Sequence, residues 1–379
     1  MYTFNYNINI NRICKKFACL FFSVIAIISA FYFNGCQKVF DEQIMLLGAP
    51  VAVYVADPNY ILDSKVDRNM RREVYDLANE LNSIFSIEEN SEISAYNTAI
   101  GEKRVKISEH FYNVLSLSKE LFTQSGGLFN PQVSHLVDLW GFTKRHKDEV
   151  FIKQKPYDRD RNSDGSFALP DQMYVDAFKS LTDFSLVTLT YDKDYFVTKP
   201  DQKVTINGET YYSALDLSSV VKGYFCDLAH KIVQSYGIKN YYISAGGSSL
   251  YLSTRPSGSW DLQIVDPFSK NREAIISVPV SNKQVAASGT YQNYYTIDGV
   301  NYSHIIDPTT GAPTKSDLVS VTLIGDDGAK LDGLSTALIN MGQEKGLEFI
   351  TNYQNINYIF INNKGEIISD IQKDITYLK

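Results

Sequence analysis

The sequence lacks the short motifs that mark the common nucleotide and zinc chemistries. It has no Gly-rich dinucleotide fingerprint, no phosphate-loop Gly-Lys-Ser/Thr and no His-Glu-x-x-His. It contains only five histidines and four cysteines, which argues against a zinc site. No period of roughly 20–50 residues indicates a repeat array. Any nucleotide site in this chain must therefore be of another kind.

Basic residues are also in the minority. The 36 Lys and Arg residues are outnumbered by 43 Asp and Glu, which gives a net charge of -7. This balance argues against a nucleic-acid partner, because such binding needs basic patches that displace counterions. Aromatic residues are abundant, with 26 Tyr. Many lie in strand-like runs, so we expect sheet packing first and stacking on a planar ligand only second.

The N-terminal segment reads as a leader. Arg12, Lys15 and Lys16 form a positive region, and an almost unbroken apolar run extends from Phe17 to Phe33. The run is near the lower length limit for spanning a bilayer, and polar sequence follows Cys36 at once. This arrangement resembles a bacterial lipoprotein signal at 1–35. The alternative is an uncleaved transmembrane anchor.

Under the lipoprotein reading Cys36 is lipidated, residues 36–47 are a tether, and the domain that follows is extracytoplasmic, on the periplasmic side of a bacterial membrane. Loss of three basic residues and no acidic one makes the mature chain more negative than -7. Cys14 and Cys19 leave with the leader, so Cys226 remains without a disulfide partner. Cys226 lies within a helical apolar pattern, which favours a core position over a nucleophile.

Hydrophobic periodicity predicts a mixed α+β domain with antiparallel sheets. Residues 144–170 are polar and predict a surface excursion. Helices are predicted at 67–85, 108–123, 219–236, 329–341 and 343–352. Strands are predicted at 51–56, 186–191, 204–207, 241–244, 262–265, 275–280, 294–297, 319–324 and 358–361.

Two segments have the composition of an anion or metal site. Asp216 precedes a helix in which Ser218 or Ser219 can cap the start and Lys222 lies one turn inside, which is a favourable place for an anion. Further along, Asp332 and Thr336 are four residues apart, so on a helix both oxygens face one side. Hard oxygen ligands of this kind suit Mg²⁺. Ordinary helix caps explain either segment alone.

Two further segments are weaker signals. His304 and Asp307 lie near the end of a strand, before a turn dictated by Asp-Pro and Gly, where a polar turn with a satisfied histidine is the plainer explanation. Gly246-Gly247 permits a tight turn or a close ligand contact. Gly333 is a poor helix residue, costing about 1 kcal/mol, and so suggests a close approach.

The order of these segments resembles the ApbE family, the FAD:protein FMN transferases. The likeness spans nearly all of 44–379 and includes His-Ile-Ile-Asp-Pro-x-Thr-Gly intact at 304–311. The other matching segments are 85–97, 127–131, 139–142, 216–224, 246–247, 287–289 and 332–338. The resemblance implies an ApbE-like, T-fold-like single catalytic domain at 48–379, with mixed or antiparallel sheets flanked by helices.

The resemblance also implies residue roles. Mg²⁺ would be held by Asp332, Thr336 and Ser219. His304 would be the catalytic residue, with Asp307 as its partner or as the base itself. FAD contacts would fall on Leu128, Phe129, Asn130, Asp216, Lys222 and Ile306. The departures are a missing Tyr near Ile87, Asn130 in place of Asp, and Ser218-Ser219 in place of a glycine pair.

The function expected from the resemblance is Mg²⁺-dependent transfer of FMN from FAD to a Ser or Thr hydroxyl of an acceptor flavoprotein, with release of AMP. The acceptor would be a protein such as a subunit of a membrane redox pump. Two alternatives stay open: an FAD pyrophosphatase that yields FMN and AMP, and a lipoprotein that only binds FAD.

Overall fold

The computed structural model describes residues 37–38, 44–57, 59–62, 64–87, 90–143, 169–371 and 373–378. The predicted leader at 1–35, Cys36, most of the tether and almost all of the 144–170 excursion lie outside these residues. Within the described ranges, no helix combines the length and apolarity that crossing a bilayer requires.

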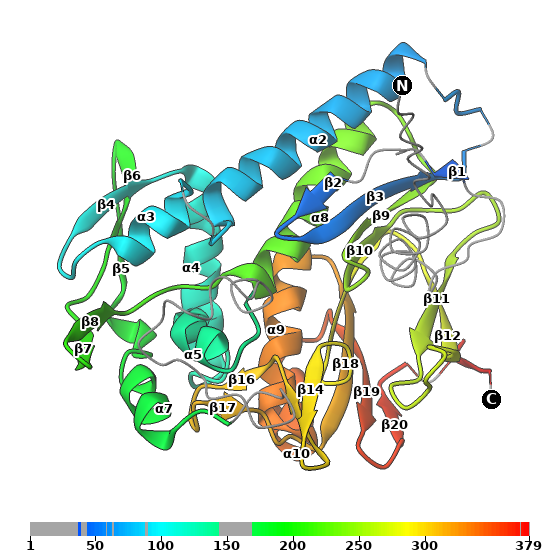
Figure 1. Cartoon of the computed structure of the whole chain (residues 1–379). Coiled ribbons are helices and arrows are strands. Elements are labelled where there is room, and N and C mark those ends of the chain that lie inside the picture. The colour runs from blue at the N-terminus through cyan, green and yellow to red at the C-terminus, as the bar shows by residue number, and fades with distance from the viewer. Residues whose placement is uncertain are drawn as a thin grey trace, which may run out of the picture.

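An antiparallel sheet forms the centre of the molecule (Figure 1). In its middle, β13 (Lys283–Gly289) pairs with β10 (Ser249–Leu252) on one side and with β18 (Leu318–Gly325) on the other. Beyond β10 follow β9 (Tyr241–Ala245), β3 (Ala49–Val55) and β1 (Gln37–Lys38), with β2 (Ile44–Leu46) also on β3. Beyond β18 follow β19 (Asn357–Asn362) and β20 (Ile367–Ser369).

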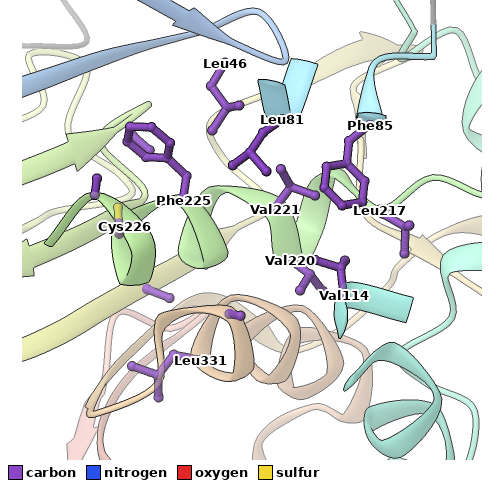
Figure 2. Close-up of a cluster of buried hydrophobic side chains, with 14 of the residues drawn as sticks. Leu46, Leu81, Phe85, Val114, Leu217, Val220, Val221, Phe225, Cys226 and Leu331 are labelled. Carbon is purple, nitrogen blue, oxygen red and sulfur yellow. The ribbon is translucent and has the colours of Figure 1, made fainter. Parts of the chain in front are cut away.

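Helices cover one face of this sheet. They are α2 (Lys65–Phe85), α8 (Ser218–Ser235), α9 (Gly328–Met341) and α10 (Gln343–Ile350). Figure 2 shows Leu81 of α2 and Val221 and Phe225 of α8 converging in the core, with Leu331 of α9 below them. Cys226 is fully buried in this cluster, which confirms the core prediction.

A smaller sheet covers part of the opposite face. It consists of β11 (Trp260–Val265), β12 (Ala274–Val280) and β21 (Thr376–Tyr377), in that order. Successive side chains of a strand point to opposite faces, so Leu323 of β18 packs with the helices and Ile324 packs with the smaller sheet. Trp260 is fully buried between the two sheets.

Shorter elements complete the molecule, most of them on the side of α8 and α9 that faces away from β11 and β12 (Figure 1). The helical ones are α3 (Glu92–Thr98), α4 (Glu109–Gln124), η1 (Pro131–Val133), α5 (Ser134–Leu139), α7 (Gln172–Lys179) and η3 (Phe184–Leu186). The strands are β4 (Arg104–Ile107), β5 (Thr188–Asp192), β6 (Asp194–Thr198), β7 (Lys203–Ile206), β8 (Glu209–Tyr212), β14 (Tyr294–Ile297), β15 (Val300–Ser303), β16 (Ile306–Asp307) and β17 (Ala312–Pro313).

The α+β prediction with antiparallel sheets is confirmed, and the five predicted helices occur within a few residues of their expected bounds. The predicted start of α8 is wrong in one respect. Neither Ser218 nor Ser219 caps it: the N-cap is Leu217, which offers no side-chain oxygen. Asp216 takes over, because its Oδ1 accepts a hydrogen bond from the Ser218 N–H at 2.9 Å.

Candidate active site

A cavity of about 360 Å³ lies where α8 begins, beside the middle of α9 and the end of β13; we call it the central cavity. Most of the predicted site residues line it: Leu128, Asn130, Asp216, Ser219, Lys222, His304, Ile306, Asp332 and Thr336. Phe129 and Asp307 are the predicted residues that do not. Segments more than two hundred residues apart in sequence therefore meet at one site.

Two glycines let helices pack closely around this cavity: Gly223 allows the contact between α8 and α9, and Gly333 allows the contact between α9 and α4. A methyl group on Gly223 would lie 2.8 Å from the Ala329 backbone nitrogen and closer still to the Gly328 carbonyl. Gly333 plays a similar part, because a methyl group there would lie 3.3 Å from the Phe129 ring and closer to Leu121. The predicted close approach at Gly333 is thus confirmed, and its partner is α4.

Asp332 lies inside α9 and does not cap it, because Asp327 is the N-cap. Its carboxylate is 3% exposed, and Oδ2 accepts a hydrogen bond from the Gly223 N–H at 3.0 Å. The Lys222 ammonium lies 3.9 Å from the same oxygen. Burial raises the pKa of Asp332, and Lys222 and the Gly223 N–H oppose that effect. A second cation at this buried carboxylate would favour its ionised form further.

The oxygens around Asp332 suit a hard cation. Thr336 follows one helical turn later and lines the same cavity, with its Oγ1 3.3 Å from the Ser288 Oγ. Ser219 lines the cavity from the first turn of α8. A carboxylate with hydroxyl and carbonyl oxygens is the donor set that Mg²⁺ takes when substrate and water complete its shell. The residues present therefore fit Mg²⁺.

Positive potential at the cavity comes from Lys222 and the start of α8. The Lys222 Nζ donates to the Ser218 carbonyl at 2.9 Å, which draws the ammonium back over the first turn of its own helix. Asp216 is held in place through its backbone, whose N–H donates to the Pro131 carbonyl at 2.7 Å. An ammonium group and helix N–H groups close together provide a binding place for phosphate.

His304 lines the cavity, and its orientation is set by the main chain. Its Nδ1 lies 3.2 Å from the Asn293 carbonyl. A carbonyl can only accept, so Nδ1 carries the proton and Nε2 is left as an acceptor. Burial lowers the pKa of His304, and the Asn293 carbonyl acts in the opposite direction. The imidazole is therefore neutral at pH 7 and able to take up a proton.

Asp307 has a different environment from the one expected of a partner for His304. Its Oδ1 accepts hydrogen bonds from the Thr309 N–H at 2.8 Å and from the Thr309 hydroxyl at 2.7 Å. The carboxylate thus stabilises the turn after β16, outside the lining of the cavity. The structure places the Asn293 carbonyl, and not Asp307, beside the His304 ring.

Some of the other predicted FAD contacts line the central cavity, and others are held in the core or in local hydrogen bonds. Leu128 and Ile306 line the cavity, whereas Phe129 is 1% exposed and packs in the core. Asn130 caps η1, with Oδ1 accepting from the Gln132 N–H at 2.9 Å and Nδ2 donating to the Thr182 carbonyl at 2.8 Å. The neutral Asn that replaces Asp in the motif is therefore fully engaged in local structure.

Sequence reasoning missed Asn340. It lies on α9 four residues after Thr336 and eight after Asp332, so all three share one helix face. Its Nδ2 donates to the carbonyls of Leu128 and Ile306 at 3.1 and 3.0 Å. Asn340 lines the cavity, and its Oδ1 is buried and has no hydrogen-bond partner within the described residues. The four-residue spacing was the signal that could have found it.

A second cavity of about 610 Å³, the side cavity, borders the first and shares Val137, Phe142, Asp216 and Ser218 with it. Its far wall contains Leu47, Phe85, Ser86 and Ile87, where the tyrosine of the family motif is missing. Both volumes fall within the range of ordinary ligand sites. Together they provide a polar compartment next to a more apolar one.

Comparison with known proteins places this geometry in a family. Residues 47–360 match the model of the ApbE family. The chain is 30% identical over 334 residues to the FAD:protein FMN transferase of Vibrio cholerae, covering 86% of this chain and 89% of that one. It is 26% identical over 344 residues to the Escherichia coli K12 protein of the same name, with coverage of 87% and 89%.

Solved structures agree. The flavin transferase ApbE from Vibrio cholerae superposes with a TM-score of 0.68 at 25% identity, covering 88% of this chain and 96% of that one. The ApbE protein from Thermotoga maritima superposes with a TM-score of 0.69 at 23% identity, covering 88% and 97%, a likeness that shows the fold. The ApbE-like fold prediction is confirmed.

Proposed function

Because the chain belongs to the ApbE family of transferases, we propose that it transfers the FMN half of FAD to a Ser or Thr hydroxyl of an acceptor flavoprotein and releases AMP. The observation that carries the proposal is the convergence of Asp332 and Thr336 from α9 with Ser219 and Lys222 from α8 on one cavity. This set provides hard oxygen ligands next to a fixed positive charge.

Asp332, Thr336 and Ser219 would hold Mg²⁺, which when bound supplies Lewis-acid polarisation of the phosphoanhydride. Lys222 and the N-terminal N–H groups of α8 stabilise the negative charge that grows on the phosphate oxygens. Asn340 lines the same cavity and holds the Leu128 and Ile306 carbonyls in place through its Nδ2. The side cavity takes one ring system of the dinucleotide.

In the transfer step the acceptor hydroxyl oxygen attacks the FMN-side phosphorus, and the bond from that phosphorus to the bridging oxygen breaks. The His304 Nε2 takes the hydroxyl proton, and AMP leaves with the bridging oxygen. The neutral ring and the tautomer set by the Asn293 carbonyl support this role. Asp307 contributes by holding the turn that follows β16.

We further propose that Cys36 is lipidated and that the domain works outside the cytoplasm, tied to a bacterial membrane. The support is the basic and apolar leader that ends at Cys36. An extracytoplasmic subunit of a membrane redox pump would then be within reach as acceptor. Labelling with a radioactive fatty acid tests this, because Cys36→Ala should abolish incorporation.

The central experiment mixes the protein with FAD, Mg²⁺ and a threonine-bearing flavoprotein subunit. Flavin fluorescence on the denatured acceptor indicates transfer, AMP without labelling indicates hydrolysis, and FAD binding without either product indicates a binding protein. We expect transfer, and its loss in Asp332→Ala. Asp192→Ala, which removes an exposed carboxylate on β5, is the matched control. Equal labelling by Asp332→Ala and wild type would refute the metal assignment.

A further inference from the structure

A third cavity, of about 260 Å³, borders the central cavity on the side of His304; we call it the sheet groove. It shares Ser248, Ala287, Gln292 and Asn293 with the central cavity. Asn293 also holds the His304 ring through its carbonyl. The sheet groove therefore opens onto the central cavity at the place where a hydroxyl would have to meet the base.

The floor of the groove contains two hydroxyl groups. Ser320 and Thr322 on β18 line the groove and are only 3% and 2% exposed. They are two residues apart, so both point to the same face of the sheet. Neither hydroxyl has a hydrogen-bond partner in the part of the chain that the structure describes. Both residues line the groove, so their hydroxyls are available to form hydrogen bonds with a ligand that enters it.

One wall of the groove is the open edge of a strand. Leu262, Gln263, Ile264 and Val265 of β11 all line it, although their side chains alternate between the two faces. Consecutive residues can share one cavity in this way when the cavity runs along the strand edge. β11 pairs only with β12 among the described strands, so its other edge is free to pair with an extended segment.

The rim of the groove has a single kind of charge. Arg272 is exposed and is the one charged residue that the lining contains. It forms no ion pair with any residue in the described ranges. A partner segment that fits this lining is neutral along most of its length and carries one acidic side chain.

We propose that the sheet groove binds an extended segment of the acceptor protein, paired along β11, with its target hydroxyl directed to His304 and an acidic residue on Arg272. The proposal rests on the transfer function argued above and adds to it how the acceptor is chosen. Main-chain pairing with β11 supplies affinity for any extended chain, and the Ser320 and Thr322 hydroxyls and Arg272 supply selectivity.

The first test uses a peptide library in which each member has one central threonine, no serine and random flanks. The library is passed over immobilised protein without FAD, and retained peptides are sequenced. We expect Asp or Glu to be enriched at one fixed distance from the threonine. Arg272→Glu should change that preference to Lys or Arg, whereas Lys270→Glu, an equal charge change on an exposed residue outside the lining, should keep the acidic preference.

The second test measures how much the Thr322 hydroxyl contributes to peptide binding. Thr322→Val keeps the shape and removes the hydroxyl, so peptide binding should weaken about 5- to 10-fold while the Kd for FAD stays unchanged. Thr188→Val, at an exposed position on β5, should change neither. Weaker FAD binding with unchanged peptide binding would mean that the nucleotide occupies the groove, and the proposal would fall.

Failure of this inference and failure of the transfer function give different results. If library peptides are labelled with flavin but Arg272→Glu does not change the preferred charge from acidic to basic, the groove proposal is refuted and the transfer function stands. If peptides are retained and Arg272→Glu changes their preferred charge, but FAD and Mg²⁺ never label them, the groove proposal is supported and the transfer function is refuted. Retention no greater than on a blank surface overturns the groove directly.

Discussion

Gly223→Ala tests whether the contact between α8 and α9 builds the active site. The added methyl group would lie 2.8 Å from the Ala329 nitrogen and closer to the Gly328 carbonyl, both of them backbone atoms that no rotamer change can move. The helices must therefore separate by on the order of 1 Å, which costs about 1–3 kcal/mol in a closely packed interior. Gly223 also donates its N–H to Asp332, so the displacement acts on the proposed metal ligand itself.

The expected result is a lower midpoint of thermal unfolding and a labelling rate reduced by about 100-fold, because a misplacement of this size costs that much in catalysis. Gly346→Ala in α10 is the matched control. Its methyl group would make only ordinary contacts, the nearest with the Leu338 side chain at 3.4 Å, and alanine favours the helix by about 1 kcal/mol. If Gly223→Ala labels the acceptor and unfolds like wild type, the reasoning from helix contact is wrong.

Three other outcomes are expected. Because burial lowers the pKa of His304, the pH profile of kcat/KM should rise with a midpoint below pH 6.5. His304→Gln should lose about 10²- to 10⁴-fold in rate. A rise centred above pH 6.5 contradicts the assignment. Burial raises the pKa of Asp227 from 3.8 to about 7, so the folded state holds a proton there that the unfolded state releases. Stability in urea should therefore fall by up to about 4 kcal/mol as pH rises from about 4 to 7, and Asp227→Asn should flatten this slope. Removal of Mg²⁺ with EDTA should stop labelling, and added Mg²⁺ should restore it; labelling that persists in EDTA removes the metal from the mechanism.

Five of the helices and nine of the strands were accessible from local pattern. The apolar spacing in α2 and α8 predicted their extents because one face of each must be buried. β13 was not predicted, although it lies in the middle of the main sheet. Its sequence Lys-Gln-Val-Ala-Ala-Ser-Gly has few β-branched residues, and it is a strand because β10 and β18 pair with it on both sides.

The site was predicted where its chemistry is carried by short motifs. Asp332 and Thr336 were identified by type and spacing, and the central cavity contains both. Two features of the site were not predicted: Asp216 accepts a hydrogen bond at the start of α8, and Asp307 lies outside the cavity. Each depends on which backbone group lies nearby in the folded chain.

Residue identity and order were sufficient for family membership and for the bounds of the five predicted helices, since these depend on contacts within a few residues or on motif order. The meeting of Gly223 with Gly328, the orientation of His304 by Asn293 and the groove between β11 and β18 depend on segments far apart in the chain. Only packing of the folded chain decides such distances, because burial rewards the close approach of surfaces that no local pattern specifies.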